Sequence, residues 1–131
     1  MKSPLKFAIA ATLAIAFTGA AHAEGDAEKG KKVFKKCKAC HAVGEGAKKK
    51  VGPHLNNIIG AKAGIQEGYK YSKAMVKAGE NGLVWSEDKL KAYLHKPKKD
   101  VKGTKMAFPG LKKEKDRDNV VAYLKQFSKS E

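Results

Sequence analysis

Cys37-Lys38-Ala39-Cys40-His41 is the stretch that decides how this 131-residue chain folds and what chemistry it carries. Two cysteines three positions apart lie on one side of a helical turn, so both thiols can bond to one edge of a flat group. His41 follows directly and is carried beneath the middle of that group. The chain has no other cysteine, which excludes a disulfide-dense scaffold.

The C-x-x-C-H order of these residues is the pattern of covalent c-type haem attachment. In that chemistry Cys37 and Cys40 add to the two vinyl groups on one edge of a porphyrin, and His41 becomes the proximal ligand of the iron. Because the thioether bonds are covalent, the haem stays bound through redox cycling outside the cytoplasm. The motif therefore predicts one haem c.

Two other kinds of site use cysteines at this spacing. A redox dithiol of the thioredoxin kind belongs beside a strand in a βαβ unit, and no run in this sequence alternates apolar and polar residues as a half-buried strand does. A zinc site needs further ligands, whereas no second cysteine pair exists and His54 and His95 follow at the wrong spacing. The sequence favours haem attachment over both.

The composition describes one small, soluble and strongly basic domain. Lysine and arginine number 28 against 13 acidic residues, and hydrophobic residues at 42% are enough for a compact core. The net charge of +15 would also suit a polyanion-binding protein. However, Arg117 is the only arginine, and arginine is the commonest side chain for reading base edges. We therefore expect no nucleic-acid partner and at most weak association with a membrane surface.

The first residues have the layout of a secretory signal peptide. Lysines precede an apolar run over residues 7–17, and Ala21-His22-Ala23 has the A-x-A form found before a signal-peptidase cut. The alternative is an anchor retained in the mature protein, but the run is shorter than the ~20 residues of a spanning helix. We expect cleavage after Ala23, which removes residues 1–23 and leaves a domain of residues 24–131 in a bacterial periplasm.

The predicted fold is all-α. Apolar residues at helical spacing predict a first helix over residues 26–38 and a last helix over residues 116–128. Ser86 is the expected cap of a further helix that Pro97 stops, and a shorter helix is expected after Ser72. The stretches rich in Gly, Pro and Lys are predicted to be loops, namely residues 42–68 and 97–113.

The ligand opposite His41 decides between a carrier and an enzyme. A strong internal ligand keeps small molecules off the iron and leaves electron transfer, whereas an open position allows peroxide or gas chemistry. Met106 stands in a loop, bounded by glycine and proline, that can fold over the opposite haem face. Met75 falls in an expected helix, where methionine is more often core filler. Spacing alone leaves four candidates: Met75, Met106, His54 and His95.

The chain closely resembles the class I c-type cytochromes, above all the small bacterial cytochrome c₂ and mitochondrial cytochrome c group. The resemblance covers nearly all of residues 24–131, with C-x-x-C-H near one end and Gly-Thr-Lys-Met near the other. It implies four or five short helices around one covalent haem, with the terminal helices crossed. Further runs that match the family are Gly30-Lys31-Lys32-Val33-Phe34, Gly52-Pro53-His54-Leu55, Lys96-Pro97-Lys98-Lys99, Gly103-Thr104-Lys105-Met106 and Val121-Ala122-Tyr123-Leu124.

The resemblance also implies the residues of the site. It makes Met106 the axial ligand opposite His41, and it makes the Pro53 carbonyl the acceptor of the second ring N–H of His41. Ala61 departs from the family pattern, since many members have an arginine there near the buried propionate, and Met75 stands where a polar residue is common. The implied haem contacts are hydrogen bonds to the propionates from Tyr71, Trp85 and Thr104, and pocket walls from Tyr93, Leu94 and Phe108.

The implied function is reversible one-electron transfer by a monomeric carrier that is not an enzyme. Suitable partners are acidic redox proteins: a cytochrome bc1-type donor, and a photosynthetic reaction centre, terminal oxidase or reductase as acceptor. The lysines next in sequence to the haem-binding segments could ring an exposed haem edge and steer such partners, namely Lys38, Lys48, Lys49, Lys50, Lys98, Lys99, Lys105, Lys112 and Lys113.

Overall fold

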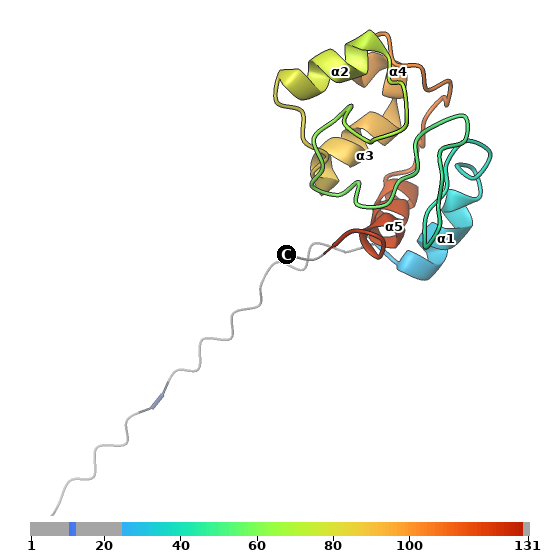
Figure 1. Ribbon diagram of the computed structural model, residues 1–131. Helices are drawn as coiled ribbons and strands as arrows, with labels where there is room; N and C mark the ends of the chain where they lie inside the picture. Colours follow the sequence, from blue (N-terminus) through green and yellow to red (C-terminus); the bar gives the residue numbers. More distant parts are fainter. Residues whose placement is uncertain (1–10, 13–24, 130–131) are drawn as a thin grey trace, which may run out of the picture.

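The computed structural model describes residues 11–12 and 25–129, and residues 25–129 form an all-α domain (Figure 1). The all-α prediction is confirmed, since the β pairing within these residues is one isolated antiparallel bridge between Lys62 and Val84. Within the same residues, no helix is long and apolar enough to cross a membrane. The expected signal peptide, apart from positions 11 and 12, lies outside the described residues. The helices are α1 (Ala27–Phe34), α2 (Lys73–Glu80), α3 (Glu87–His95), α4 (Pro97–Asp100) and α5 (Glu114–Lys125).

Helix α1 begins where predicted and ends before the cysteine motif. The Asp26 side chain accepts hydrogen bonds from the backbone N–H groups of Glu28 and Lys29, at 2.9 and 3.1 Å, and so caps the first turn. The expected helix over residues 26–38 runs four residues past the end of α1 at Phe34. From there several backbone N–H groups bond to the carbonyl three residues earlier. These tighter turns carry both cysteines.

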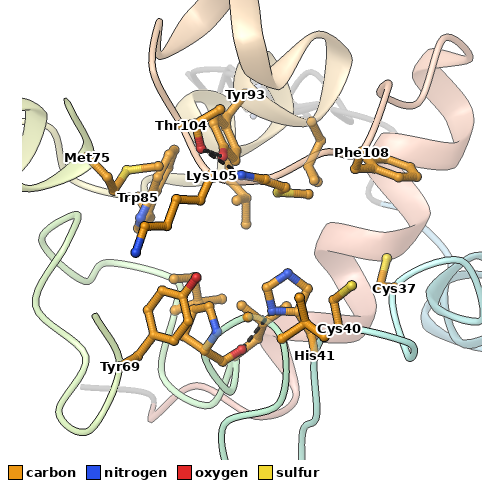
Figure 2. A pocket seen from close by; sticks show the side chains of 18 of the residues that line it. Cys37, Cys40, His41, Tyr69, Met75, Trp85, Tyr93, Thr104, Lys105 and Phe108 are labelled. Carbon is orange, nitrogen blue, oxygen red and sulfur yellow. Dashed lines mark hydrogen bonds between the residues drawn. The ribbon is translucent and has the colours of Figure 1, made fainter. Parts of the chain in front are cut away.

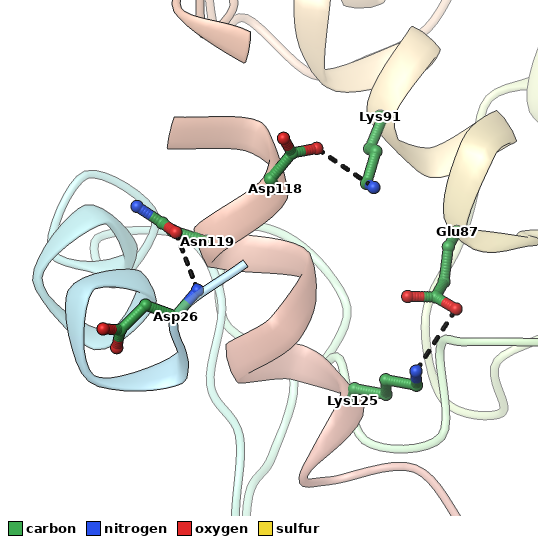
Figure 3. Close-up of polar contacts among 6 residues, drawn as sticks. All are labelled: Asp26, Glu87, Lys91, Asp118, Asn119 and Lys125. Atoms are coloured by element: carbon green, nitrogen blue, oxygen red, sulfur yellow. Dashed lines mark hydrogen bonds and ion pairs between the residues drawn. The ribbon is translucent and has the colours of Figure 1, made fainter. Parts of the chain in front are cut away.

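Helices α1 and α5 cross in close contact, which confirms the predicted arrangement of the terminal helices (Figures 1 and 3). Gly30 is buried at the contact, and a Cβ atom there would overlap the carbonyl oxygen of Asn119 and lie 2.8 Å from the Tyr123 Cβ. The Asn119 side chain in turn accepts a hydrogen bond of 2.8 Å from the Asp26 N–H. Phe34 and Tyr123 pack with ring centroids 5.4 Å apart. The absence of a side chain at Gly30 therefore lets the two backbones meet.

Helix α5 differs at both ends from the prediction of residues 116–128. It begins at Glu114, whose carboxylate joins that of Asp116 in the first turn, where acidic groups suit the helix dipole. It ends at Lys125, because the following residues bond to carbonyls three positions earlier. Two ion pairs at the surface link α5 to α3, the partly buried Lys91–Asp118 at 3.0 Å and the more exposed Lys125–Glu87 at 3.4 Å (Figure 3). Such surface pairs add little stability. The contact is therefore stabilised mainly by the burial of apolar side chains, namely Val120, Val121 and Leu124.

The loop prediction for residues 97–113 is wrong at its start. Pro97 ends α3, as expected, but it also occupies the first turn of the short helix α4. A proline is favourable there because its fixed φ suits a helix and its missing N–H needs no partner. The N–H groups of Lys99 and Asp100 both bond to the Lys96 carbonyl and close the turn. Residues 42–68 contain no helix, as predicted.

Helix α2 packs on loops, since it contacts none of the other described helices. The Ser72 hydroxyl caps it by accepting a 3.0 Å hydrogen bond from the Met75 N–H, as the sequence predicts. Gly79 lies against the backbone of Ala63, where a Cβ would overlap the Ala63 carbonyl oxygen. This attachment brings Met75 into the core beside Trp85.

Replacing Gly30 with alanine is expected to destabilise the folded protein by about 1–3 kcal/mol. Overpacking at the α1–α5 contact outweighs the gain of about 1 kcal/mol in helix propensity. Denaturant unfolding of the variant measures this difference. Lys29→Ala, on the exposed side of the same helix, is the control and should change stability by less than about 0.5 kcal/mol. Equal unfolding midpoints for both variants would contradict the tight crossing.

Candidate functional site

One cavity of about 370 Å³ lies in the middle of the domain, and its walls are mainly apolar (Figure 2). It is bordered by segments that are far apart in the sequence: α1 and the cysteine motif, the loop after it, α2, α3, residues 104–108 and α5. The residues that line the cavity include the exposed Val51 and the exposed Lys36 and Lys105, so part of its boundary reaches the protein surface. A large flat apolar group with one exposed edge suits this shape.

The cysteine motif supplies one side of the cavity. Figure 2 shows the sulfur atoms of Cys37 and Cys40 on the same side of the His41 ring. Cys37 and Cys40 are not joined by a disulfide. Burial, and secondarily the proximity of Cys40, raises the pKa of Cys37 to about 11. Redox-active dithiols work through a lowered thiol pKa, so this site is unlike a thioredoxin-type centre.

His41 presents a free ring nitrogen to the cavity. Its Nδ1–H donates a 2.7 Å hydrogen bond to the Pro53 carbonyl oxygen, as the resemblance implies. Because a carbonyl can only accept, this bond places the proton on Nδ1 and leaves the Nε2 lone pair available as a ligand. Burial lowers the pKa of His41, against the opposing effect of the Pro53 bond, and so favours the neutral ring. Gly52 makes room for this orientation, since a Cβ there would lie 2.5 Å from the His41 Cε1.

The wall opposite His41 is formed by residues 104–108, the segment that contains Met106 (Figure 2). The Thr104 hydroxyl is 2.7 Å from the Tyr93 hydroxyl, and the Met106 N–H points at the same threonine oxygen from 3.4 Å. The segment is therefore held to α3 through one polar contact in an apolar environment.

Two of the four candidate ligands border the cavity. Met106 and Met75 both line it, whereas His54 and His95 do not. The His54 Nε2 is 2.7 Å from the Gln66 side-chain nitrogen, and His95 is exposed at the end of α3. Residues 25–129 contain no group of three or more His, Cys, Asp or Glu side chains arranged to hold a metal ion, so a zinc site finds no support there.

The aromatic residues named from the resemblance lie together. Trp85 is only 5% exposed and packs on Tyr93, with ring centroids 4.9 Å apart. Tyr71 accepts a 3.3 Å hydrogen bond from the Gln66 N–H. Burial raises the pKa of both Tyr71 and Tyr93, so both hydroxyls stay protonated and able to donate. All the site residues predicted from the sequence border this cavity: Cys37, Cys40, His41, Pro53, Tyr71, Trp85, Tyr93, Thr104, Met106 and Phe108.

Sequence reasoning missed several contributors. Tyr69 lines the cavity and packs edge-to-face on Tyr71, at 4.8 Å, and the Tyr-x-Tyr spacing was the available signal. Lys105 donates a 2.8 Å hydrogen bond to the Lys70 carbonyl, and Lys50 donates a 2.6 Å bond to the Lys38 carbonyl. Two of the lysines expected to face partners are thus also engaged within the molecule.

The arrangement fits a covalently bound haem. Two thiols lie beside a histidine whose free nitrogen faces a methionine-bearing wall across an apolar space. Each of these groups matches what the porphyrin edge, the iron and the macrocycle require. Fold and site together define a small all-α haem protein of the covalently attached class.

Comparison with known proteins places the chain within a family. Residues 27–128 match the Cytochrome c family, to which the chain therefore belongs. Cytochrome c2 of Agrobacterium tumefaciens (strain II Chrys) is 55% identical over 101 residues, which cover 77% of this chain and 91% of the relative. Cytochrome c2 of Afifella marina is 58% identical over 98 residues, covering 75% of this chain and 79% of the relative.

A solved structure agrees with these relatives. That of cytochrome c2 from Rhodospirillum Centenum superposes with a TM-score of 0.76 at 44% identity, covering 80% of this chain and 100% of that chain. The chain is accordingly a class I c-type cytochrome of the c2 group, with one covalent haem c. It is an electron carrier and not an enzyme.

Replacing Gly52 with alanine is expected to displace the His41 ring from Pro53 and to cost about 1–3 kcal/mol of stability. The added Cβ has no room beside the imidazole. Denaturant unfolding measures the loss, and the NMR signal of the His41 Nδ1 proton reports the hydrogen bond. Val51→Ala, at the neighbouring exposed position, is the control. An unshifted Nδ1 proton in Gly52→Ala would show that this glycine does not position His41.

Proposed function

We propose that this cytochrome is a periplasmic one-electron shuttle whose iron is ligated by His41 and Met106. The observation that carries the proposal is the hydrogen bond of 2.7 Å from His41 to the Pro53 carbonyl. It frees the His41 Nε2 to face the wall that contains Met106, so two neutral ligands of suitable chemistry stand on opposite sides of one apolar cavity.

The chain's own residues perform four tasks in this mechanism. Cys37 and Cys40 fix the haem, which when bound supplies one-electron exchange between ferric and ferrous iron. The Pro53 carbonyl holds the His41 ring in one orientation, and the Tyr93–Thr104 contact supports the methionine segment. The apolar walls exclude water and disfavour net positive charge. Burial and the soft Met106 thioether both favour the reduced state, so the midpoint potential is relatively high.

The propionate groups of the haem are proposed to bind Tyr71, Trp85 and Thr104. Tyr71 and Thr104 bring hydroxyl groups and Trp85 an indole N–H to the cavity wall. Tyr93 and Phe108 complete the pocket as apolar walls. Ala61 stands where many family members have an arginine, so hydrogen bonds replace a guanidinium charge as the main compensation for the propionates in this chain.

The open side of the cavity is the proposed docking face for acidic redox partners. Among the residues that line the cavity, Lys36 and Lys105 are exposed, and so is the apolar Val51, at 74%. A small apolar contact flanked by lysine point charges supports fast encounter and fast release. A cytochrome bc1-type complex is the proposed donor, and a reaction centre, terminal oxidase or reductase the acceptor.

Replacing Met106 with alanine is expected to remove the weak long-wavelength absorption band of methionine-sulfur ligation in the ferric protein. The midpoint potential should fall by on the order of 0.1–0.3 V, within the roughly 0.8 V that axial ligands control. The ferrous variant should bind carbon monoxide at the vacated position. Met75→Ala removes the other cavity methionine and should keep the band. Loss of the band in Met75→Ala alone would assign the ligand to Met75.

Reaction rates with a bc1-type complex should fall as salt rises, because screening weakens long-range steering. At low salt, Lys36→Glu should slow association roughly three- to tenfold. Lys77→Glu makes the same change in net charge on α2, away from the cavity, and should stay within about twofold of the original rate. A rate that does not depend on salt, or equal effects of both variants, would reject the proposed docking face.

The exported protein is expected to begin at Glu24. Cleavage after Ala23 follows from the small residues at positions 21 and 23. Terminal sequencing of protein from the periplasmic fraction should give Glu24-Gly25-Asp26. A chain that starts at Met1 and fractionates with membranes would contradict this proposal and indicate a membrane-anchored carrier.

A further inference from the structure

A second groove, of about 410 Å³, lies on α2 and shares no residue with the haem cavity. Its floor is apolar and is formed by Ala74 and Ala78 of α2, by Leu83, and by Val101 after α4. Figure 1 shows α2 and α4 beside each other at the same end of the domain. Helix α2 contacts no other described helix, and the groove lies between α2 and the segment after α4, which come close where a Cβ on Gly103 would lie 3.0 Å from the Ala74 Cβ.

Positive charge gathers around this groove from three different segments. Lys77 lies on α2, Lys89 on α3 and Lys102 after α4, and the Asn81 side chain also borders the groove. The one carboxylate on the rim is Asp100. The ion pairs among residues 25–129 are Lys91–Asp118 and Lys125–Glu87, so none of these four charged groups is paired there. Three lysines and one opposing carboxylate thus line a groove with an apolar floor.

We propose that this groove binds a small multivalent oxyanion of the phosphate or polycarboxylate class. The volume lies in the range of roughly 300–1,000 Å³ that small-molecule sites occupy. Lysines on three segments suit a compact ligand with several negative oxygens, because each ammonium acts as a point charge and a single oxyanion can accept from all three. The Asn81 amide can donate a further hydrogen bond. A monovalent anion gains little, since Asp100 offsets its attraction.

Occupation of the groove joins two walls of the haem cavity. The α2 side carries Met75, and Lys102 precedes Met106 by four residues on the other side. An oxyanion held by both Lys77 and Lys102 adds a bridge between these segments beside the close approach of Gly103 to Ala74. A dissolved anion bound in the groove would thereby stabilise the methionine side of the cavity. This effect on the cavity rests on the proposed function, whereas binding of the anion does not.

Calorimetric titration of the haem-loaded mature protein at low ionic strength tests the site. Inorganic pyrophosphate and citrate are the probes, with chloride at matched ionic strength as the reference. We expect pyrophosphate, citrate or both to bind with one-to-one stoichiometry, and the pair distinguishes a phosphate site from a polycarboxylate site. Chloride should not compete at the same ionic strength. Failure of both probes to bind, or binding of several anions per protein, would overturn the proposal.

Matched variants separate this groove from the general basic surface. The double variant Lys77→Gln with Lys102→Gln should weaken binding about tenfold or more, since a charge-assisted hydrogen bond is worth roughly a factor of ten. Lys29→Gln with Lys115→Gln removes the same charge from α1 and α5 and should change the affinity less than about twofold. Asp100→Asn removes the opposing carboxylate and should tighten binding several-fold. Equal weakening in both double variants, or weaker binding by Asp100→Asn, would contradict the site.

Chemical shifts locate the anion without a variant. On addition of pyrophosphate, amide signals should move for residues of α2, for Asn81, and for residues 100–102. Shifts spread evenly over all exposed lysines would assign the anion to net charge alone. The visible absorption spectrum should stay unchanged in either case, so this result does not depend on which residues ligate the iron.

Discussion

The hydrogen bond from the His41 Nδ1–H to the Pro53 carbonyl is the constraint on which the site depends. It fixes the tautomer, aims the Nε2 into the cavity, and couples the cysteine motif to the loop that follows it. Gly52 protects the bond by leaving the imidazole unobstructed. If the His41 ring could rotate, its Nε2 would no longer point into the space that the two thiols and the methionine-bearing wall border. One neutral hydrogen bond therefore organises groups from three parts of the chain.

The α1–α5 crossing supplies the support for this arrangement. Gly30 brings the two backbones together, and the tight turns that follow α1 carry Cys37 and Cys40 to the edge of the cavity. Phe34 on α1, and Val120 and Leu124 on α5, line the same cavity. The packing of the terminal helices and the binding of the prosthetic group therefore depend on each other, because the same side chains contribute to both.

Local signals in the sequence predicted much of the fold and of the site. They could not predict contacts between residues that are far apart in the chain. The cysteine spacing and the serine caps of α2 and α3 each act within a few residues, so a linear reading captures them. The end of α1 and the helix at Pro97 were misjudged, since a change from four-residue to three-residue hydrogen bonds has no strong composition signal. The contact of Gly52 with His41 spans eleven positions. Choosing Met106 over Met75 needed the family resemblance, because both methionines border the cavity.

The central claim is that Cys37 and Cys40 hold one haem through covalent bonds. Its most direct test is extraction of the purified exported protein with acidified organic solvent, followed by the intact mass of the polypeptide. The account predicts that the colour stays with the protein and that the mass equals the chain from Glu24 plus one haem. A colourless polypeptide, or a pigment that passes into the solvent and leaves the bare chain mass, would contradict it.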